Sequence, residues 1–280
     1  MKVGLVLEGG AMRGMYTAGV LDIFLDHQIP VDGIIGVSAG VLFGVNYVSK
    51  QRGRALRYNL KYAGDKRYMG IHSLITTGNI VNKDFAYYEV PFKLDLFDQE
   101  TFASSKTDFY ATVTNIDSGK AEYIKITDVY KQMEVFRATS AMPFVSKIVS
   151  LDNKKYLDGG IADSIPVDKC HELGYDKIIV VLTRPLEYRK KKTNTLVPKI
   201  VYHKYPNFVD AINQRYQKYN QTVAKIAKLE KENKIFVIRP SRTVPIKRLE
   251  KDPERLQELY DLGVVDSKKR IDDLINYLND

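Results

Sequence analysis

The chain of 280 residues carries 43 lysines and arginines against 34 aspartates and glutamates, a formal net charge of +9. Its 44% hydrophobic and 28% charged residues are typical of a folded protein and exclude an intrinsically disordered one. A single cysteine, Cys170, excludes an intrachain disulfide and a zinc cluster of cysteines. No segment approaches the ~18 apolar residues of a membrane span. The apolar run at the N-terminus leads directly into glycines, unlike a signal peptide, so we expect a cytoplasmic protein.

Hydrophobic periodicity predicts alternating strands and helices over the first fifty residues. Residues 3–7 are an apolar run typical of a buried parallel strand, and helical spacing follows over 15–27. Residues 32–37 are a second predicted strand, and 41–48 a second helix. This order predicts a parallel sheet with right-handed crossovers.

The pattern continues less regularly through the rest of the chain. We predict a helix over 52–64, an irregular region over 70–106, and a strand hairpin from 109–116 and 121–126. A helix is predicted over 129–142, with short strands at 155–157, 177–182 and 235–238. A long amphipathic helix is predicted over 207–232, with its apolar stripe in the core, and another helix from residue 253. We expect one α/β domain spanning 1–280, with a motif-bearing core of about 3–185 that residues 186–280 complete.

The segment Gly36-Val37-Ser38-Ala39-Gly40 is a G-x-S-x-G where a predicted strand ends and a helix begins. A serine in that context takes a strained turn that exposes its hydroxyl at the sheet edge, and the flanking glycines leave room for it. The helix N-terminus adds unpaired N–H groups and a positive dipole end. Ser38 is therefore a candidate nucleophile, supported by Gly36 and Gly40. The alternative is an ordinary serine N-cap.

A glycine-rich turn, residues 8–14, joins the first strand to the first helix. A P-loop would need lysine at Met15, and a dinucleotide fingerprint would need glycine at Ala11 and an acid where Ser38 stands. The turn is then either a tight turn without a ligand or an anion-holding turn of N–H groups. Neighbouring parallel strands end at one edge of a sheet, so the turn and Ser38 would face one crevice, which favours an oxyanion hole. Its candidate residues are Gly9, Gly10, Ala11, Arg13 and Gly14.

A third motif, Asp158-Gly159-Gly160, follows a short predicted strand. Alone it is typical of a plain turn. Beside a nucleophile and an oxyanion loop, Asp158 is the candidate general base, with Gly159 and Gly160 supporting the bend.

The four histidines do not offer a better base. A Ser-His-Asp hydrolase of the usual α/β type has the chain order Ser, acid, His, which leaves only His171 and His203. Neither has a recognisable catalytic setting, so both are interpreted as surface residues. The sequence therefore favours a Ser–Asp dyad.

These three motifs, in this order and at strand ends, resemble the bacterial patatin-like phospholipases. That family carries a glycine-rich oxyanion loop ending in Arg-Gly, a G-x-S-x-G, and an Asp-Gly-Gly or Asp-Gly-Ala. Residues 137–144 and 165–167 also resemble family segments, and the resemblance covers about residues 3–185. It implies a three-layer sandwich, with helices on both faces of a mainly parallel sheet. Many members have three consecutive glycines where this chain has Ala11, at which a left-handed backbone would be strained.

The resemblance implies hydrolysis of lipid acyl esters through a covalent acyl-enzyme. Asp158 would take the proton from Ser38, and the amides of residues 9–11 and of Ala39 would stabilise the oxyanion. Arg13 is expected to anchor its loop to a carboxylate such as Glu8, the alternative being contact with a phosphate. No metal or cofactor is expected. Two alternatives remain: a non-catalytic lipid-binding protein, and an acyltransferase that uses the same serine.

Basic residues concentrate in the segment 184–204, which holds seven lysines and arginines against one acid, Glu187. This charge predicts contact with an anionic membrane surface, peripheral to the inner face of the membrane. The alternative is a solvated loop. Nucleic-acid binding is not expected, because no recognised module accompanies the charge. The sequence leaves the oligomeric state open.

Overall fold

The computed structural model describes residues 1–280, and its centre is an eight-stranded sheet. The strand order is β5-β6-β3-β2-β1-β7-β8, and β4 pairs with β3 outside this path. The parallel strands are β1 (Val3–Leu7), β2 (Gly33–Val37), β3 (Asp108–Asn115), β7 (Lys177–Val181) and β8 (Phe236–Ile238). Antiparallel pairing brings in β4 (Ala121–Ile126), β5 (Val149–Leu151) and β6 (Lys154–Asp158). The sheet is mixed and mainly parallel, as the sequence predicts.

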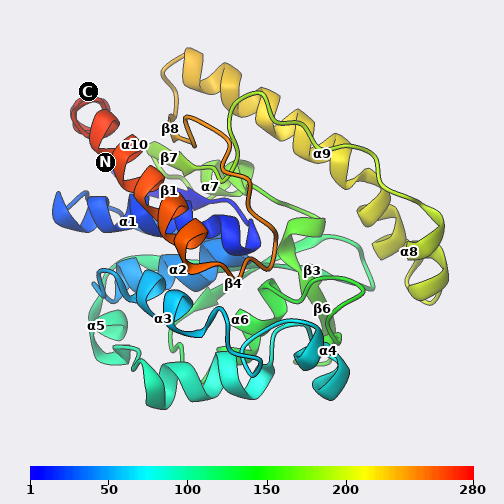
Figure 1. Cartoon of the computed structure of the whole chain (residues 1–280). Coiled ribbons are helices and arrows are strands. Elements are labelled where there is room, and N and C mark those ends of the chain that lie inside the picture. Colours follow the sequence, from blue (N-terminus) through cyan, green and yellow to red (C-terminus); the bar gives the residue numbers. More distant parts are fainter.

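Helices cover both faces of this sheet (Figure 1). Side chains alternate along β1, so Leu5 and Leu7 join one core while Val6 joins the other. The first core includes α1 (Met15–Asp26), α2 (Ala39–Val48) and α10 (Pro253–Asn279). The second includes α7 (Val167–Glu172) and α9 (Pro206–Lys231). The predicted three-layer α/β fold is confirmed.

The region 70–106 is not irregular, so that prediction was wrong. It contains α4 (Ile71–Thr77), the π-type helix η2 (Asp84–Leu94) and α5 (Gln99–Ser104), after α3 (Arg54–Tyr62). These helices are short or depart from the 3.6-residue period, and η2 contains a proline, so no amphipathic pattern reveals them. The helix predicted over 129–142 is confined to α6 (Met133–Thr139), and β5 and α8 (Leu196–Val201) were not predicted.

Strands β2 and β6 lie end to end along the same edge of β3. Val37, the last residue of β2, pairs with Thr112, and Asp158, the last residue of β6, pairs with Val113. Both strands must occupy this edge, because β4 fills the other edge over Phe109–Thr114. Since β2 is parallel to β3 and β6 antiparallel, their carboxyl ends face each other. This arrangement brings residues 38 and 158 together.

The C-terminal helix α10 completes the core by packing against α1 (Figure 1). The two backbones approach closely where Gly19 and Gly263 lie, because a Cβ atom on either residue would stand 2.2 Å from a carbonyl oxygen of the other helix. Buried hydrogen bonds join the helices on both sides: the Tyr260 hydroxyl donates to Asp22 over 2.6 Å, and the Tyr16 hydroxyl to Asp266 over 3.2 Å. None of the helices combines the length and the apolar character needed to cross a membrane.

Replacing Gly263 by alanine should destabilise the protein. The new methyl group would overlap the carbonyl of Tyr16 and force α10 away from α1, at a cost of about 1–3 kcal/mol in the free energy of unfolding. Urea denaturation measures this change. Gly64→Ala is the matched control, because its Cβ atom would meet nothing within 4 Å. Equal stability of the two variants would contradict the close contact between α1 and α10.

Candidate active site

Ser38 occupies a strained position between β2 and α2. Its φ of 53° lies in the left-handed region, which residues other than glycine rarely adopt. The tight turn requires glycine at Gly40, where a Cβ atom would stand 2.5 Å from the carbonyl oxygen of Leu7. The Ser38 amide donates to Thr139 Oγ1 over 2.9 Å, and that hydroxyl donates in turn to the Thr112 carbonyl on β3 over 2.6 Å. Thr139 therefore ties the serine to the central strand.

Asp158 ends β6 with its carboxylate turned toward Ser38. One carboxylate oxygen accepts a hydrogen bond from the Gly160 amide over 2.8 Å, and the Ser38 hydroxyl lies close enough to favour the ionised form of the carboxyl. The bend requires Gly159, where a Cβ atom would stand 2.1 Å from the Thr112 carbonyl oxygen. The carboxylate is thus fixed by the backbone that follows it.

Burial raises the pKa of the Asp158 carboxyl above its ordinary value. The positive charge of Arg215, the Gly160 amide, the Ser38 hydroxyl and the charge of Lys190 act in the opposite direction, but burial outweighs them. A carboxylate with a raised pKa is a stronger base than an exposed one. The pair can therefore pass a proton from the serine hydroxyl to the carboxylate.

The turn after β1 presents free backbone donors beside this pair. The amides of Gly10 and Ala11 donate no hydrogen bond within the protein, whereas the Gly9 amide lies 3.5 Å from the Ser164 carbonyl oxygen. Ala11 has a left-handed backbone, with φ of 50°, which is strained for a residue other than glycine. The Arg13 amide donates to the Gly10 carbonyl and closes the turn. Two unpaired amides, those of Gly10 and Ala11, are thus available to an anion.

The remaining motif glycines allow close packing. A Cβ atom would stand 2.7 Å from the Phe43 ring at Gly14 and 2.9 Å from the Gly40 backbone at Gly36. These glycines let η1 (Ala11–Gly14) and α2 approach each other and the sheet.

The expected anchoring of Arg13 to Glu8 is wrong. Glu8 is buried and accepts hydrogen bonds from the Thr183 amide over 2.6 Å and from the Tyr219 hydroxyl over 2.8 Å. Arg13 forms no ion pair and no side-chain hydrogen bond, and it lines a cavity instead. The sequence could not reveal this, because Thr183 reaches Glu8 from the loop after β7 and Tyr219 reaches it from α9.

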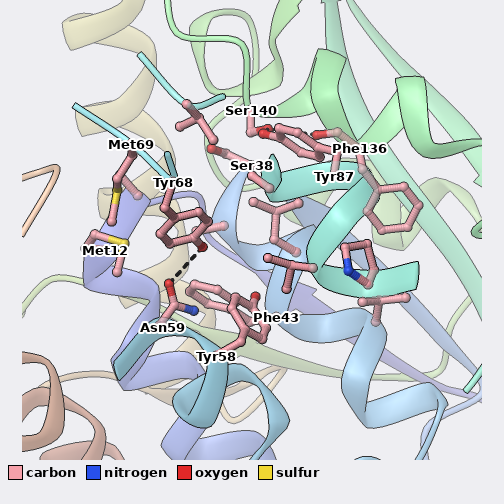
Figure 2. A pocket seen from close by; sticks show the side chains of 18 of the residues that line it. Met12, Ser38, Phe43, Tyr58, Asn59, Tyr68, Met69, Tyr87, Phe136 and Ser140 are labelled. Atoms are coloured by element: carbon pink, nitrogen blue, oxygen red, sulfur yellow. Dashed lines mark hydrogen bonds between the residues drawn. The ribbon is translucent and has the colours of Figure 1, made fainter. Parts of the chain in front are cut away.

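Two cavities meet at Ser38. The first, called here the apolar cavity, has a volume of about 120 Å³, and 19 of its 25 lining residues are hydrophobic. Figure 2 shows Ser38 at its border, among the rings of Phe43, Tyr68, Tyr87 and Phe136. The unpredicted helix η2 supplies part of the wall, including Tyr87. This cavity can hold a hydrocarbon chain next to the serine.

The second cavity, called here the polar cavity, has a volume of about 620 Å³ and reaches both Ser38 and Asp158. Its charged lining is mostly basic: Arg13, Arg184, Lys190, Lys191, Arg215 and Arg248, against Glu8 and Asp158. No sequence motif marks Thr139, Arg215 or Arg248 as site residues. Thr139 lies in the segment 137–144 that carries part of the resemblance, and Arg215 in the amphipathic pattern of 207–232, but no pattern includes Arg248. Neither His171 nor His203 lines either cavity.

Comparison with known proteins identifies two families along the chain. Residues 5–171 match the family described as "Patatin-like phospholipase", and residues 205–279 match a "Domain of unknown function (DUF6363)". Among solved structures, that of VipD from Legionella pneumophila is similar with a TM-score of 0.45 and 13% identity, over 97% of this chain and 67% of that one.

Curated relatives share the motif-bearing part of the chain. The "Uncharacterized protein YjjU" of Escherichia coli is 33% identical over 190 residues, which is 66% of this chain and 52% of that protein. "Lysophospholipase nte1" of Aspergillus niger is 30% identical over 191 residues, or 64% of this chain and 12% of that one. The chain thus spans about half of the first relative and about an eighth of the second. Because the family match covers more than half of the chain and includes all three motifs, this chain belongs to the patatin-like phospholipase family.

Proposed function

We propose that the protein hydrolyses acyl esters of lipids through a covalent acyl-enzyme, with Ser38 as nucleophile and Asp158 as general base. The observation that carries this proposal is the meeting of β2 and β6 on β3, which places Ser38, at the border of the apolar cavity, next to the buried carboxylate of Asp158. Relatives named as lysophospholipases support a lipid ester as substrate.

The first half of the reaction acylates the serine. The Ser38 oxygen attacks the ester carbonyl carbon while its proton passes to Asp158. The carbonyl oxygen becomes an oxyanion, and the free amides of Gly10 and Ala11 stabilise it. Loss of one such donor typically costs about 3–4 kcal/mol of barrier. The carbon–oxygen bond to the leaving alcohol then breaks, and Asp158 returns the proton to that alcohol.

The second half releases the acid. Asp158 takes a proton from water, and the resulting hydroxide attacks the acyl carbon bound to Ser38. The same amides stabilise the oxyanion. The bond from the acyl carbon to the Ser38 oxygen then breaks, and Asp158 returns its proton to that oxygen. Burial supports the aspartate in both halves, because it raises the pKa of the carboxyl toward that of an effective base.

Covalent labelling with a fluorophosphonate tests the dyad. The wild-type protein should form one adduct, on Ser38, by intact mass and peptide mapping. Ser38→Ala should form none, and labelling of Asp158→Asn should be slower by at least about 100-fold, the usual contribution of a general base. Ser150→Ala, which removes an exposed serine of β5, should label like the wild type.

The alternatives give different outcomes. A folded wild-type protein without an adduct would contradict the dyad and favour a lipid-binding protein. An adduct on Ser38, with acyl glycerol as the main product when glycerol is present, would favour an acyltransferase.

The pH profile of turnover should have an acidic limb that the protonation of Asp158 causes. Only the ionised carboxylate accepts the serine proton, so kcat/KM for a water-soluble ester should fall as the pH falls through the pKa of this group. Because burial raises that pKa, the midpoint should lie above the ~3.9 of an ordinary aspartate. Circular dichroism over the same range separates this limb from unfolding. A midpoint at or below the ordinary value would contradict Asp158 as the base.

The segment 184–204 is proposed to contact an anionic membrane surface through α8. This short helix exposes four apolar side chains with lysines beside them: Leu196, Val197, Ile200 and Val201, with Lys192, Lys199 and Lys204. Val197 also lines the polar cavity, so α8 borders its mouth. Exposed apolar and basic side chains together are the composition that binds anionic bilayers.

Replacing Ile200 by aspartate should weaken this contact. The change removes one apolar side chain from the bilayer and adds a negative charge, so binding to phosphatidylglycerol vesicles should fall at least about tenfold in a flotation assay at low salt. Ile275→Asp on α10 is the control, because it makes the same change at another partly exposed isoleucine. Equal binding by both variants would leave the segment as a solvated loop.

A further inference from the structure

The polar cavity holds an unbalanced group of cations. Six basic side chains line it against the two carboxylates of Glu8 and Asp158. Glu8 accepts hydrogen bonds from Thr183 and Tyr219, and Asp158 accepts one from Gly160. Their two negative charges attract these cations but balance only two of the six positive charges.

None of the six basic side chains takes part in any ion pair of the protein, although nineteen ion pairs exist elsewhere in it. Lys190 donates to Ser164 Oγ and Arg215 to the Gly160 carbonyl, but the guanidinium groups of Arg13, Arg184 and Arg248 donate no hydrogen bond. Three arginines thus converge on one cavity with their donors unused.

The crowding of these basic side chains disfavours their charged forms. Burial and the charges of Arg184 and Arg248 lower the pKa of Arg13 to about 10. Burial and the charge of Arg215 likewise lower the pKa of Lys190 far below its ordinary value. An anion in the cavity would relieve both effects, because it would supply the charge and the hydrogen-bond acceptors that the protein lacks.

We propose that the polar cavity is the headgroup subsite of the same active centre and selects lipids with a terminal phosphate monoester, such as a monoacylglycerol phosphate. This inference rests on the proposed hydrolysis at Ser38. The apolar cavity holds the acyl chain on one side of the serine, and the arginines hold the phosphate on the other. Guanidinium groups suit this ligand, since each can donate two parallel hydrogen bonds to phosphate oxygens.

The same surroundings disfavour a choline headgroup. A quaternary ammonium needs open aromatic faces, but Lys190 already lies 3.6 Å from the ring centre of Tyr219, and Arg184 lies 4.2 Å from that of Tyr188. Six nearby cations would also repel it. The cavity therefore discriminates by charge, against zwitterionic lipids.

The C-terminal segment supplies part of this selection. Arg215, on α9, and Arg248 lie within residues 205–279, the part that matches a domain of unknown function. Arg184 and Lys190 precede it, and only Arg13 lies within the phospholipase match. We infer that the segment 205–279 contributes headgroup recognition to the family's catalytic core.

Hydrolysis of monomeric short-chain lipids tests this proposal without a membrane surface. Three substrates share one octanoyl chain: a glycerol phosphate ester, a glycerophosphocholine ester and the neutral p-nitrophenyl ester. We expect kcat/KM for the phosphate lipid to exceed that for the choline lipid at least about tenfold, the equivalent of one charged hydrogen bond. Arg248→Gln and Arg184→Gln should each lower the ratio of phosphate lipid to p-nitrophenyl ester at least about tenfold.

Arg242→Gln is the control, because Arg242 is an exposed arginine six residues before Arg248 that pairs with Glu258 outside the cavity. It should leave the ratio unchanged. Hydrolysis of the p-nitrophenyl ester with no preference for the phosphate lipid would overturn the headgroup subsite alone. Failure to hydrolyse any of the three esters would overturn the proposed hydrolysis itself. Inhibition by glycerol phosphate, but much weaker inhibition by inorganic phosphate, is expected of a headgroup subsite. Equal inhibition by both would indicate a site for free phosphate and overturn the proposal.

Discussion

The candidate active site depends on the pairing of one edge of β3 with two different strands. Parallel β2 fills the first part of this edge, and antiparallel β6 fills the last part, so the two carboxyl ends meet. The Thr112 carbonyl lies at this junction, where it accepts the Thr139 hydroxyl and lies against Gly159. Backbone pairing of β2 and β6 with β3, together with the Thr139 hydroxyl, therefore holds the serine and the aspartate next to each other.

Local sequence patterns could predict the elements but not this junction. Ser38 and the glycine turn lie where a strand runs directly into a helix, and a few neighbouring residues determine such a turn. The contact between Ser38 and Asp158 spans 120 residues and depends on the antiparallel direction of β6, which no local pattern encodes. Likewise, the basic segment 184–204 is visible in the sequence. The sequence does not show which of its lysines point into the cavity and which are exposed. Lys190 points inward because Tyr219 of α9 lies beneath it, while Lys192 is exposed.

The buried charged groups of the site lower the stability of the folded protein. Burial raises the pKa of Asp158, so its ionised form costs stability at neutral pH, and that cost disappears as the pH falls through the raised pKa. Arg13 and Lys190 have lowered pKa values, so their charged forms are also disfavoured by folding. Attraction between Asp158 and Arg215 offsets only part of this. An anion bound in the polar cavity would offset more of this loss of stability, because it would add negative charge beside the basic side chains.

Backbone strain at the site adds to this cost. Ser38 and Ala11, in the turns after β2 and β1, both adopt left-handed backbones that cost about 1–2 kcal/mol each. Together these are a sizeable part of the roughly 5–15 kcal/mol that stabilises a typical domain. Glycine at Ala11 would relieve the strain, and this gain exceeds the roughly 0.4–1 kcal/mol that glycine costs by giving the unfolded chain more freedom. Heat tolerance can therefore be raised beside the serine at Ala11, whereas the strain at Ser38 cannot be removed without loss of the proposed nucleophile.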